Sequence, residues 1–161
     1  MPYHEPDSRV LNLAGDIDDR GQPLPMSVDA LRARAEKWAV SEHTPVDVAR
    51  QLARSRQIFV DGYFTYENFI DAVVRSLQAV EAALRVRLNV GTSVGFAQLI
   101  DRAKALAVIS EETREALHAG RAFRNSQIHA TTMAMITPAI AAGMIAASHK
   151  LIADLFDTPA N

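Results

Sequence analysis

Apolar side chains recur at helical spacing along most of the chain. The clearest run predicts a helix from about Tyr66 to Leu88, because its apolar residues follow a period of about 3.6: Ile70, Val73, Val74, Leu77, Val80, Leu84 and Leu88. No stretch alternates apolar and polar residues over a useful strand length, and no internal repeat is visible. The pattern therefore predicts an all-α fold, an antiparallel bundle of five to six helices.

Capping residues mark the starts of the other predicted helices, because their side-chain oxygens can accept hydrogen bonds from free N–H groups there. A following proline strengthens two of these starts, at Thr44-Pro45 and Thr137-Pro138. The helices expected on this basis cover about 27–40, 45–62, 93–106, 111–129 and 139–156. The last one is rich in small residues, which suit close packing against another helix or across a dimer.

Residues 1–25 differ from the rest of the chain in composition. They combine four prolines with the acidic cluster Asp16, Asp18 and Asp19, which favours an extended or disordered acidic leader. The alternative is a segment that docks on a partner or on a second subunit. Residues 26–158 are expected to form a single helical domain, since 161 residues suit one domain with a sizeable core.

Charge is unevenly distributed along the chain. The net charge is −2, and residues 1–30 hold two arginines against six acids (−4), so residues 31–161 come to +2. This nearly neutral body lacks the strongly basic surface of proteins that grip long nucleic acid by its backbone. Any RNA contact is therefore expected to be local.

Several kinds of site are excluded by residues that the chain lacks. Cysteine is absent, which excludes disulfides, thiolate zinc sites and a cysteine nucleophile and is compatible with a reducing compartment. No signal peptide is visible, and the apolar stretch Pro138–Ser148 is shorter than the roughly 18 to 20 residues that cross a bilayer. We therefore expect a cytoplasmic protein without a membrane contact. Neither a metal-ligand spacing nor a Gly-rich phosphate loop occurs, so no metal and no cofactor are expected.

Candidate chemistry concentrates in the stretch Arg121–His129. Asn125 and His129 are four residues apart and share a helix face, and the long side chain of Arg124 can reach the same side. Arginine binds phosphate in a fork, and histidine can move protons near neutral pH. The three side chains therefore suit phosphodiester cleavage without a metal. The alternative is an ordinary helix end, where cations favour the C-terminal dipole and asparagine often closes the last turn.

The segment Arg124–His129 resembles the motif of the HEPN superfamily, in which an arginine and a histidine are separated by four to six residues and a polar residue follows the arginine. The stretches 96–106 and 109–129 are similar to the two helices before the motif, and 79–85 resembles the family's long helix. The likeness covers about residues 45–156.

This resemblance implies a HEPN-like α-helical bundle and commonly a homodimer whose two motif helices face one cleft. For many members it also implies a metal-independent endoribonuclease, in which Arg124 would hold the scissile phosphate and His129 would transfer protons, leaving a cyclic phosphate. Many other members are inactive. One toxin branch of the family has a tyrosine two residues after the histidine and a nucleotidyltransferase antitoxin. This chain has Thr131 at that position, so the motif does not support membership of that branch.

Charged residues interrupt the apolar faces of two predicted helices. Arg121 and Arg124 lie within about 40° of Leu117 on a helical wheel, and Glu81 lies on the inward side of the 66–88 helix, where a charge is costly unless it is paired. The arginines either form ion bridges with Glu81 and other acids or line a cleft that receives an anion such as phosphate, and both roles are compatible. Arg121 and Glu81 are therefore candidates for substrate binding or for support behind the site.

Together these observations predict a homodimeric endoribonuclease in a toxin, defence or RNA-processing setting, with RNA as partner and Arg124, His129 and Asn125 as catalytic residues. The expected substrate is single-stranded or looped RNA, and Asn125 would fix the histidine or bind phosphate. An antitoxin or another regulatory protein is a candidate partner. The alternative is a catalytically inactive HEPN-like module for dimerisation or for binding a nucleotide or protein. A transcriptional regulator would need a DNA-reading helix, and no segment resembles one.

Overall fold

The computed structural model describes residues 5–129 and 136–158, and the side chains of Ile128 and His129 lie outside that description. Its elements are β1 (Ala14–Ile17), β2 (Pro23–Pro25), α1 (Val28–Glu36), α2 (Val46–Asp61), α3 (Asn68–Leu88), α4 (Phe96–Ala105), α5 (Glu111–His129) and α6 (Pro138–Asp157). The predicted all-α class is confirmed, because helices make up most of the described structure and the two strands described form one short sheet.

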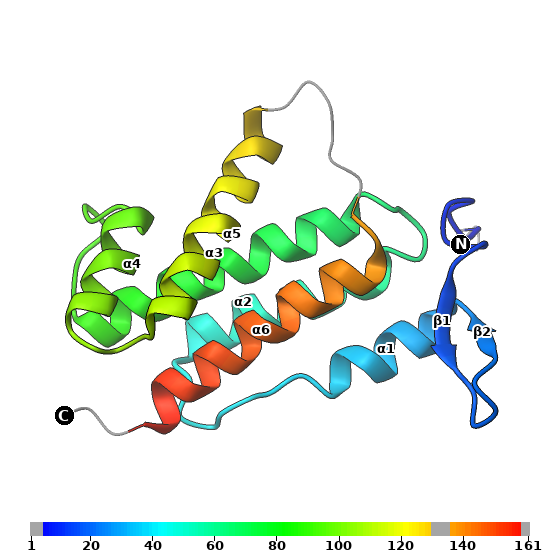
Figure 1. Cartoon of the computed structure of the whole chain (residues 1–161), viewed down its shortest axis with the longest axis horizontal. Helices are drawn as coiled ribbons and strands as arrows, with labels where there is room; N and C mark the ends of the chain where they lie inside the picture. Colours follow the sequence, from blue (N-terminus) through cyan, green and yellow to red (C-terminus); the bar gives the residue numbers. More distant parts are fainter. Residues whose placement is uncertain (1–4, 130–135, 159–161) are drawn as a thin grey trace.

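Helix α3 lies at the centre of the fold, with α2 and α6 packed along it (Figure 1). The order of the colours shows that α2 runs against α3, whereas α6 runs in the same direction as α3, so the predicted antiparallel arrangement is wrong for α3 and α6. Helix α1 packs against α2 and α6, α4 packs on the end of α3 that leads into it, and α5 packs on α4 and crosses α3 near Leu77. The bundle is therefore organised around a single long helix.

The apolar stripe of α3 explains this central position, because burying it removes apolar surface from water. Val73 and Leu84, three turns apart on this helix, are both fully buried. Val73 belongs to a part of the core that includes Phe59 of α2 and the start of α6, and Leu84 to a second part that includes Leu99 of α4 and the end of α6. Helix α3 thus connects two apolar regions at opposite ends of the bundle.

Helix α6 begins as its capping signal predicts. The backbone N of Ile140 donates to Thr137 Oγ1 at 3.2 Å, and Pro138 is the first helical residue. By length and composition α6 could cross a membrane, but Ile145 and Ile152 are fully buried in the bundle. Part of its apolar surface therefore serves the packing of the core.

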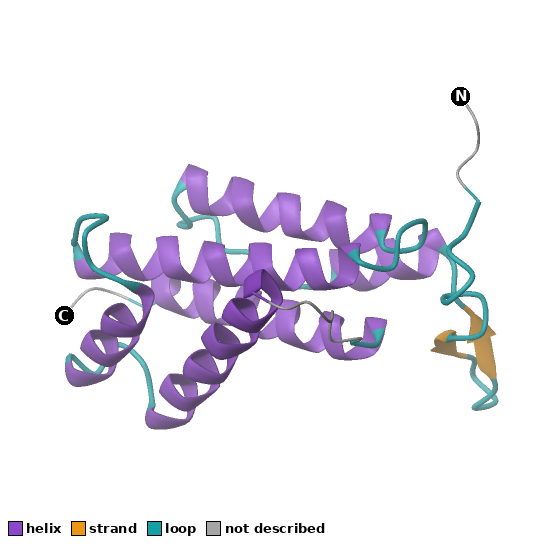
Figure 2. Cartoon of the chain, turned by 90° about the horizontal axis from the view of Figure 1, so that it is seen from above, coloured by secondary structure: helices purple, strands orange, loops and turns teal. Residues whose placement is uncertain are grey.

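Composition suggests that residues 1–25 form an extended or disordered leader. Residues 5–15 of this segment contact the bundle, whereas most of residues 16–25 are exposed. Val10 has no exposed surface, and Asp7 accepts hydrogen bonds from Arg9 Nη2 at 2.7 Å and from the backbone N of Tyr66 at 3.1 Å. The hydrogen bonds from Arg9 hold the pKa of Asp7 well below its usual range. The β1–β2 hairpin follows, and Figure 2 shows it at one end of the bundle, away from α4.

Candidate functional site

Helix α5 carries the candidate site and projects from the body of the bundle (Figure 1). Ser110 caps its start, since its Oγ accepts a hydrogen bond from the backbone N of Thr113 at 3.0 Å. Among the α5 residues whose side chains are described, Leu117 and Gly120 are the buried ones. Gly120 lies so close to α3 that a Cβ atom there would be 3.0 Å from Leu77 Cδ2. The helix therefore touches α3 at one crossing, and its second half leaves the bundle.

An ion-pair cluster lies beside this crossing, with Glu81 of α3 at its centre. Glu81 Oε2 accepts a hydrogen bond from Arg124 Nη1 at 2.8 Å, and Glu81 Oε1 accepts one from Arg85 Nη2 at 2.5 Å. Arg85 also donates to the backbone carbonyls of Gly91 and Val94, in the loop between α3 and α4. The three charged side chains are 17 to 19% exposed. The acid thus links α5 to both α3 and the following loop.

Arg124 is held on more than one side. Its Cζ atom lies 5.1 Å from the centroid of the Phe96 ring, a distance typical of a cation–π contact. Its Nε atom is buried without a partner, and Nη2 makes no hydrogen bond to any residue that the structure describes. The guanidinium is therefore fixed in place by Glu81 and Phe96 while part of its hydrogen-bonding capacity stays unused.

Arg121, one turn earlier on α5, has a different environment. Its side chain is half-buried and its Nε atom is buried without a partner. No hydrogen bond or ion pair joins Arg121 to another residue within 5–129 or 136–158. The pairing expected between Glu81 and an arginine of this helix is therefore made by Arg124, and Arg121 does not share it.

The polar side chains after Arg124 are also only partly satisfied. Asn125 is half-buried and has no hydrogen-bond partner among the residues described, and Gln127 Oε1 is buried without one. Ser126 Oγ donates to the backbone carbonyl of Phe123 at 2.7 Å. His129 is the last residue of α5, and its side chain lies outside the described part of the structure. The convergence of Arg124 and His129 that the sequence suggests stays a prediction.

A second polar cluster joins α5 to α4. Asp101 Oδ1 lies 2.9 Å from His118 Nε2 and accepts a hydrogen bond from Arg114 Nε at 2.8 Å. These bonds, from His118 and then Arg114, lower the pKa of Asp101. Sequence reasoning missed this cluster, because the three residues come together only when α4 packs on α5. Across the described residues, no group of three His, Asp or Glu side chains is placed to hold a metal ion.

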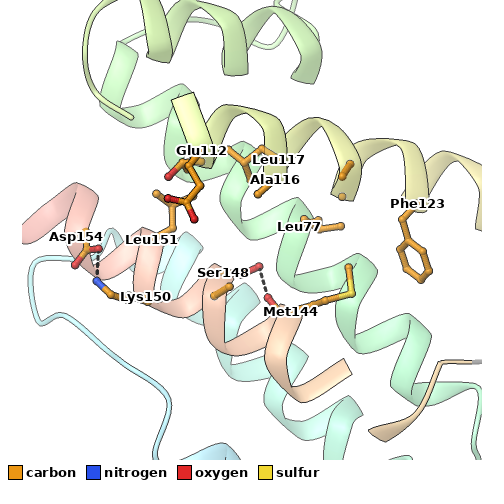
Figure 3. A pocket seen from close by; sticks show the side chains of 14 residues that line it. Leu77, Glu112, Ala116, Leu117, Phe123, Met144, Ser148, Lys150, Leu151 and Asp154 are labelled. Carbon is orange, nitrogen blue, oxygen red and sulfur yellow. Dashed lines mark hydrogen bonds and ion pairs between the residues drawn. The ribbon is translucent and has the colours of Figure 1, made fainter. Parts of the chain in front are cut away.

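An apolar groove of about 840 Å³ opens on the other side of α5, between α5 and α6 (Figure 3). Leu77 of α3 contributes to its lining, with Phe123 from α5 and Met144 from α6. At one end Lys150 pairs with Asp154 at 2.6 Å. Sequence periodicity could not reveal this groove, since it arises from the divergence of two helices that are each amphipathic.

Comparison with known proteins gives no family for this chain. No protein-family model, no curated protein and no solved structure matches it.

Proposed function

We propose that the chain is a HEPN-like, metal-independent endoribonuclease acting on single-stranded or looped RNA, with Arg124 and His129 as its principal catalytic residues. The observation that carries this proposal is the fixed position of Arg124, held by Glu81 and Phe96 on the half of α5 that leaves the bundle. After Glu115 this helix has two arginines and no acid.

A fixed cation is what a phosphodiester transition state requires. Negative charge builds on the phosphate oxygens during cleavage, and a donor already in position stabilises it without the cost of reorganisation. Arg124 donates to Glu81 through Nη1, which leaves Nη2 for a phosphate oxygen. Glu81 then acts as a positioning residue, because it holds Arg124 without contacting the substrate.

His129 supplies proton transfer in this proposal. The 2′-oxygen of the ribose attacks phosphorus, the bond from phosphorus to the 5′-oxygen breaks, and a cyclic phosphate remains. One proton leaves the 2′-hydroxyl and one reaches the departing 5′-oxygen, and a histidine can serve either transfer near neutral pH. Asn125 lies one turn before His129 and would orient the imidazole or bind phosphate.

The substrate class follows from charge and shape. The chain has a net charge of −2, so it lacks a long basic surface for duplex nucleic acid. A 2′-hydroxyl must approach in line with the bond that breaks, and the flexible backbone of a single strand or loop permits this more readily than a duplex. We therefore propose a short contact with unpaired RNA.

The test is cleavage of single-stranded RNA in EDTA by purified variants. Arg124→Ala and His129→Ala should each lower the cleavage rate about 100-fold or more. Arg54→Ala, on the exposed side of α2, is the matched control and should cleave like the native chain. Circular dichroism checks that all variants fold. Unchanged cleavage by both site variants would assign the activity to another site or to a contaminant.

One observation favours a second candidate, an inactive HEPN-like binding module. Arg124 is only 17% exposed and paired with Glu81, as in a purely structural ion bridge. In that case Arg124→Ala would lower stability, His129→Ala would change nothing, and the native chain would not cleave RNA. The cleavage assay therefore separates the two candidates.

The proposed enzyme is a cytoplasmic homodimer without a membrane contact. An antitoxin or another regulatory protein is the proposed further partner. Affinity purification of the tagged chain from its native cells would identify such a partner, with the His129→Ala variant used to avoid toxicity.

A further inference from the structure

Arg121 is the arginine of the candidate site whose charge is not neutralised. Glu81 is the acid that contacts this half of α5, and it is shared by Arg124 and Arg85. Two arginines therefore share one carboxylate, and Arg121 makes no ion pair within the described part of the chain. Its surplus charge is available to an incoming anion.

Burial makes this surplus unusual. A guanidinium loses favourable hydration when it is partly buried, and proteins normally compensate with an acid or a carbonyl. The Nε atom of Arg121 is shielded from solvent and unpaired, while the side chain as a whole is half-buried. A partly buried guanidinium without an acid partner favours the binding of an anion that can supply one.

We propose that Arg121 binds a phosphodiester group of the RNA, next to the phosphate that Arg124 holds. Residues three apart on a helix are neighbours, so the two guanidinium groups can contact the same or adjacent phosphates. Asn125 is four residues after Arg121 and His129 a further four, so all three share a face of α5. The identity of the ligand as RNA rests on the proposed function, whereas the anion site rests on Arg121 itself.

The experiment measures binding separately from cleavage. A fluorescent single-stranded oligoribonucleotide with methylated 2′-oxygens cannot be cut by 2′-attack, and its affinity for the full chain is measured by fluorescence anisotropy over a range of salt concentrations. Arg121→Gln should weaken binding about tenfold, as expected for the loss of one charged hydrogen-bond pair, and lower the salt slope by about 0.7. Arg54→Gln should change neither quantity.

Inorganic phosphate and a nucleoside monophosphate, tested as competitors, distinguish the possible sources of the phosphate. Weak competition by both supports an RNA backbone site, whereas tight binding of either one without binding of the oligonucleotide overturns it. Equal oligonucleotide binding by native and Arg121→Gln chains also overturns the inference, whether or not RNA is cleaved. Loss of binding in Arg121→Gln in a chain that never cleaves RNA would keep the anion site and refute only the nuclease.

Discussion

At the scale of single residues, His149 in the middle of α6 is a buried titratable group. It is 1% exposed, and its Nδ1 atom lies 3.0 Å from the backbone carbonyl oxygen of Ala39. That distance fits an Nδ1–H group that donates a hydrogen bond to the carbonyl oxygen. Nδ1 then cannot accept a hydrogen bond from Arg56 Nη2, which lies 3.4 Å away. Burial, with a smaller effect from the charge on Arg56, lowers the pKa of His149 to about 4.

This geometry predicts a loss of stability in mild acid. Since the folded pKa lies below the usual 6.5, the unfolded chain binds a proton more readily, and stability falls as the pH drops from about 6.5 to about 4. The loss is on the order of 3 kcal/mol. Urea denaturation at several pH values measures it.

His149→Asn is the control for this prediction, because the asparagine amide can still donate to Ala39 but does not titrate. Its free energy of unfolding should vary less between pH 6.5 and 4 than that of the native chain. Parallel pH profiles for the two proteins would show that the acid sensitivity has another origin.

Part of the candidate site could be predicted from the sequence, and part depends on how the chain folds. The inward position of Glu81 predicts a cationic partner, and Arg124 is that partner. The role of Arg85 was not foreseen, although it is four residues from Glu81, because it also binds loop carbonyls whose position depends on the fold. The unsatisfied Nε atom of Arg121 depends on packing in the same way.

At the scale of elements, prediction succeeded where either a long apolar stripe, as in α3, or a side-chain cap at the start, as in α5 and α6, marks the helix. Helices α3, α5 and α6 lie within two residues of their expected bounds. Helix α1 ends at Glu36 and not near Val40, because the carbonyls of Trp38 and Ala39 accept hydrogen bonds from Arg56 and His149 on other helices. The β1–β2 hairpin was missed, since two of the three residues of β2 are prolines.

The crossing of α5 over α3 gives a prediction about a single glycine. Gly120 permits the close approach, since a Cβ atom would already lie 3.0 Å from Leu77 Cδ2. Gly120→Val should therefore lower the free energy of unfolding by about 1 to 3 kcal/mol. It should also slow RNA cleavage, because α5 would move and carry Arg124 away from Glu81. Urea denaturation and the cleavage assay measure the two effects.

Gly143 on α6 offers the matched control, because no described atom outside its own helix segment lies within 4 Å of the position of its added Cβ. Gly143→Ala should raise stability by about 0.5 to 1 kcal/mol, since alanine is the better helix former. A stable and active Gly120→Val variant would show that the close contact between α3 and α5 is not needed.

At the scale of the whole molecule, the divergence of α5 from α6 leaves an apolar face that no residue of 5–129 or 136–158 covers. The groove between them is lined mostly by small or apolar residues, including Ala119 and Ala147, with the charged residues Glu112, Lys150 and Asp154 toward one end. Helical spacing continues its α6 side to Ile140, which is 54% exposed. An exposed apolar groove can serve as an interaction site. Small side chains also allow two helices to approach closely.

We therefore predict that a second copy of the chain covers this groove in a symmetric dimer, which would bring two α5 helices near each other. Light scattering after gel filtration should give twice the 17.6 kDa mass of one chain. Ala147→Glu places a charge in the groove and should yield monomers, because a buried unpaired carboxylate is costly. Ala53→Glu, on an exposed position of α2, should stay dimeric. A monomeric native chain would refute the dimer, and a dimeric Ala147→Glu variant would place its interface on another face.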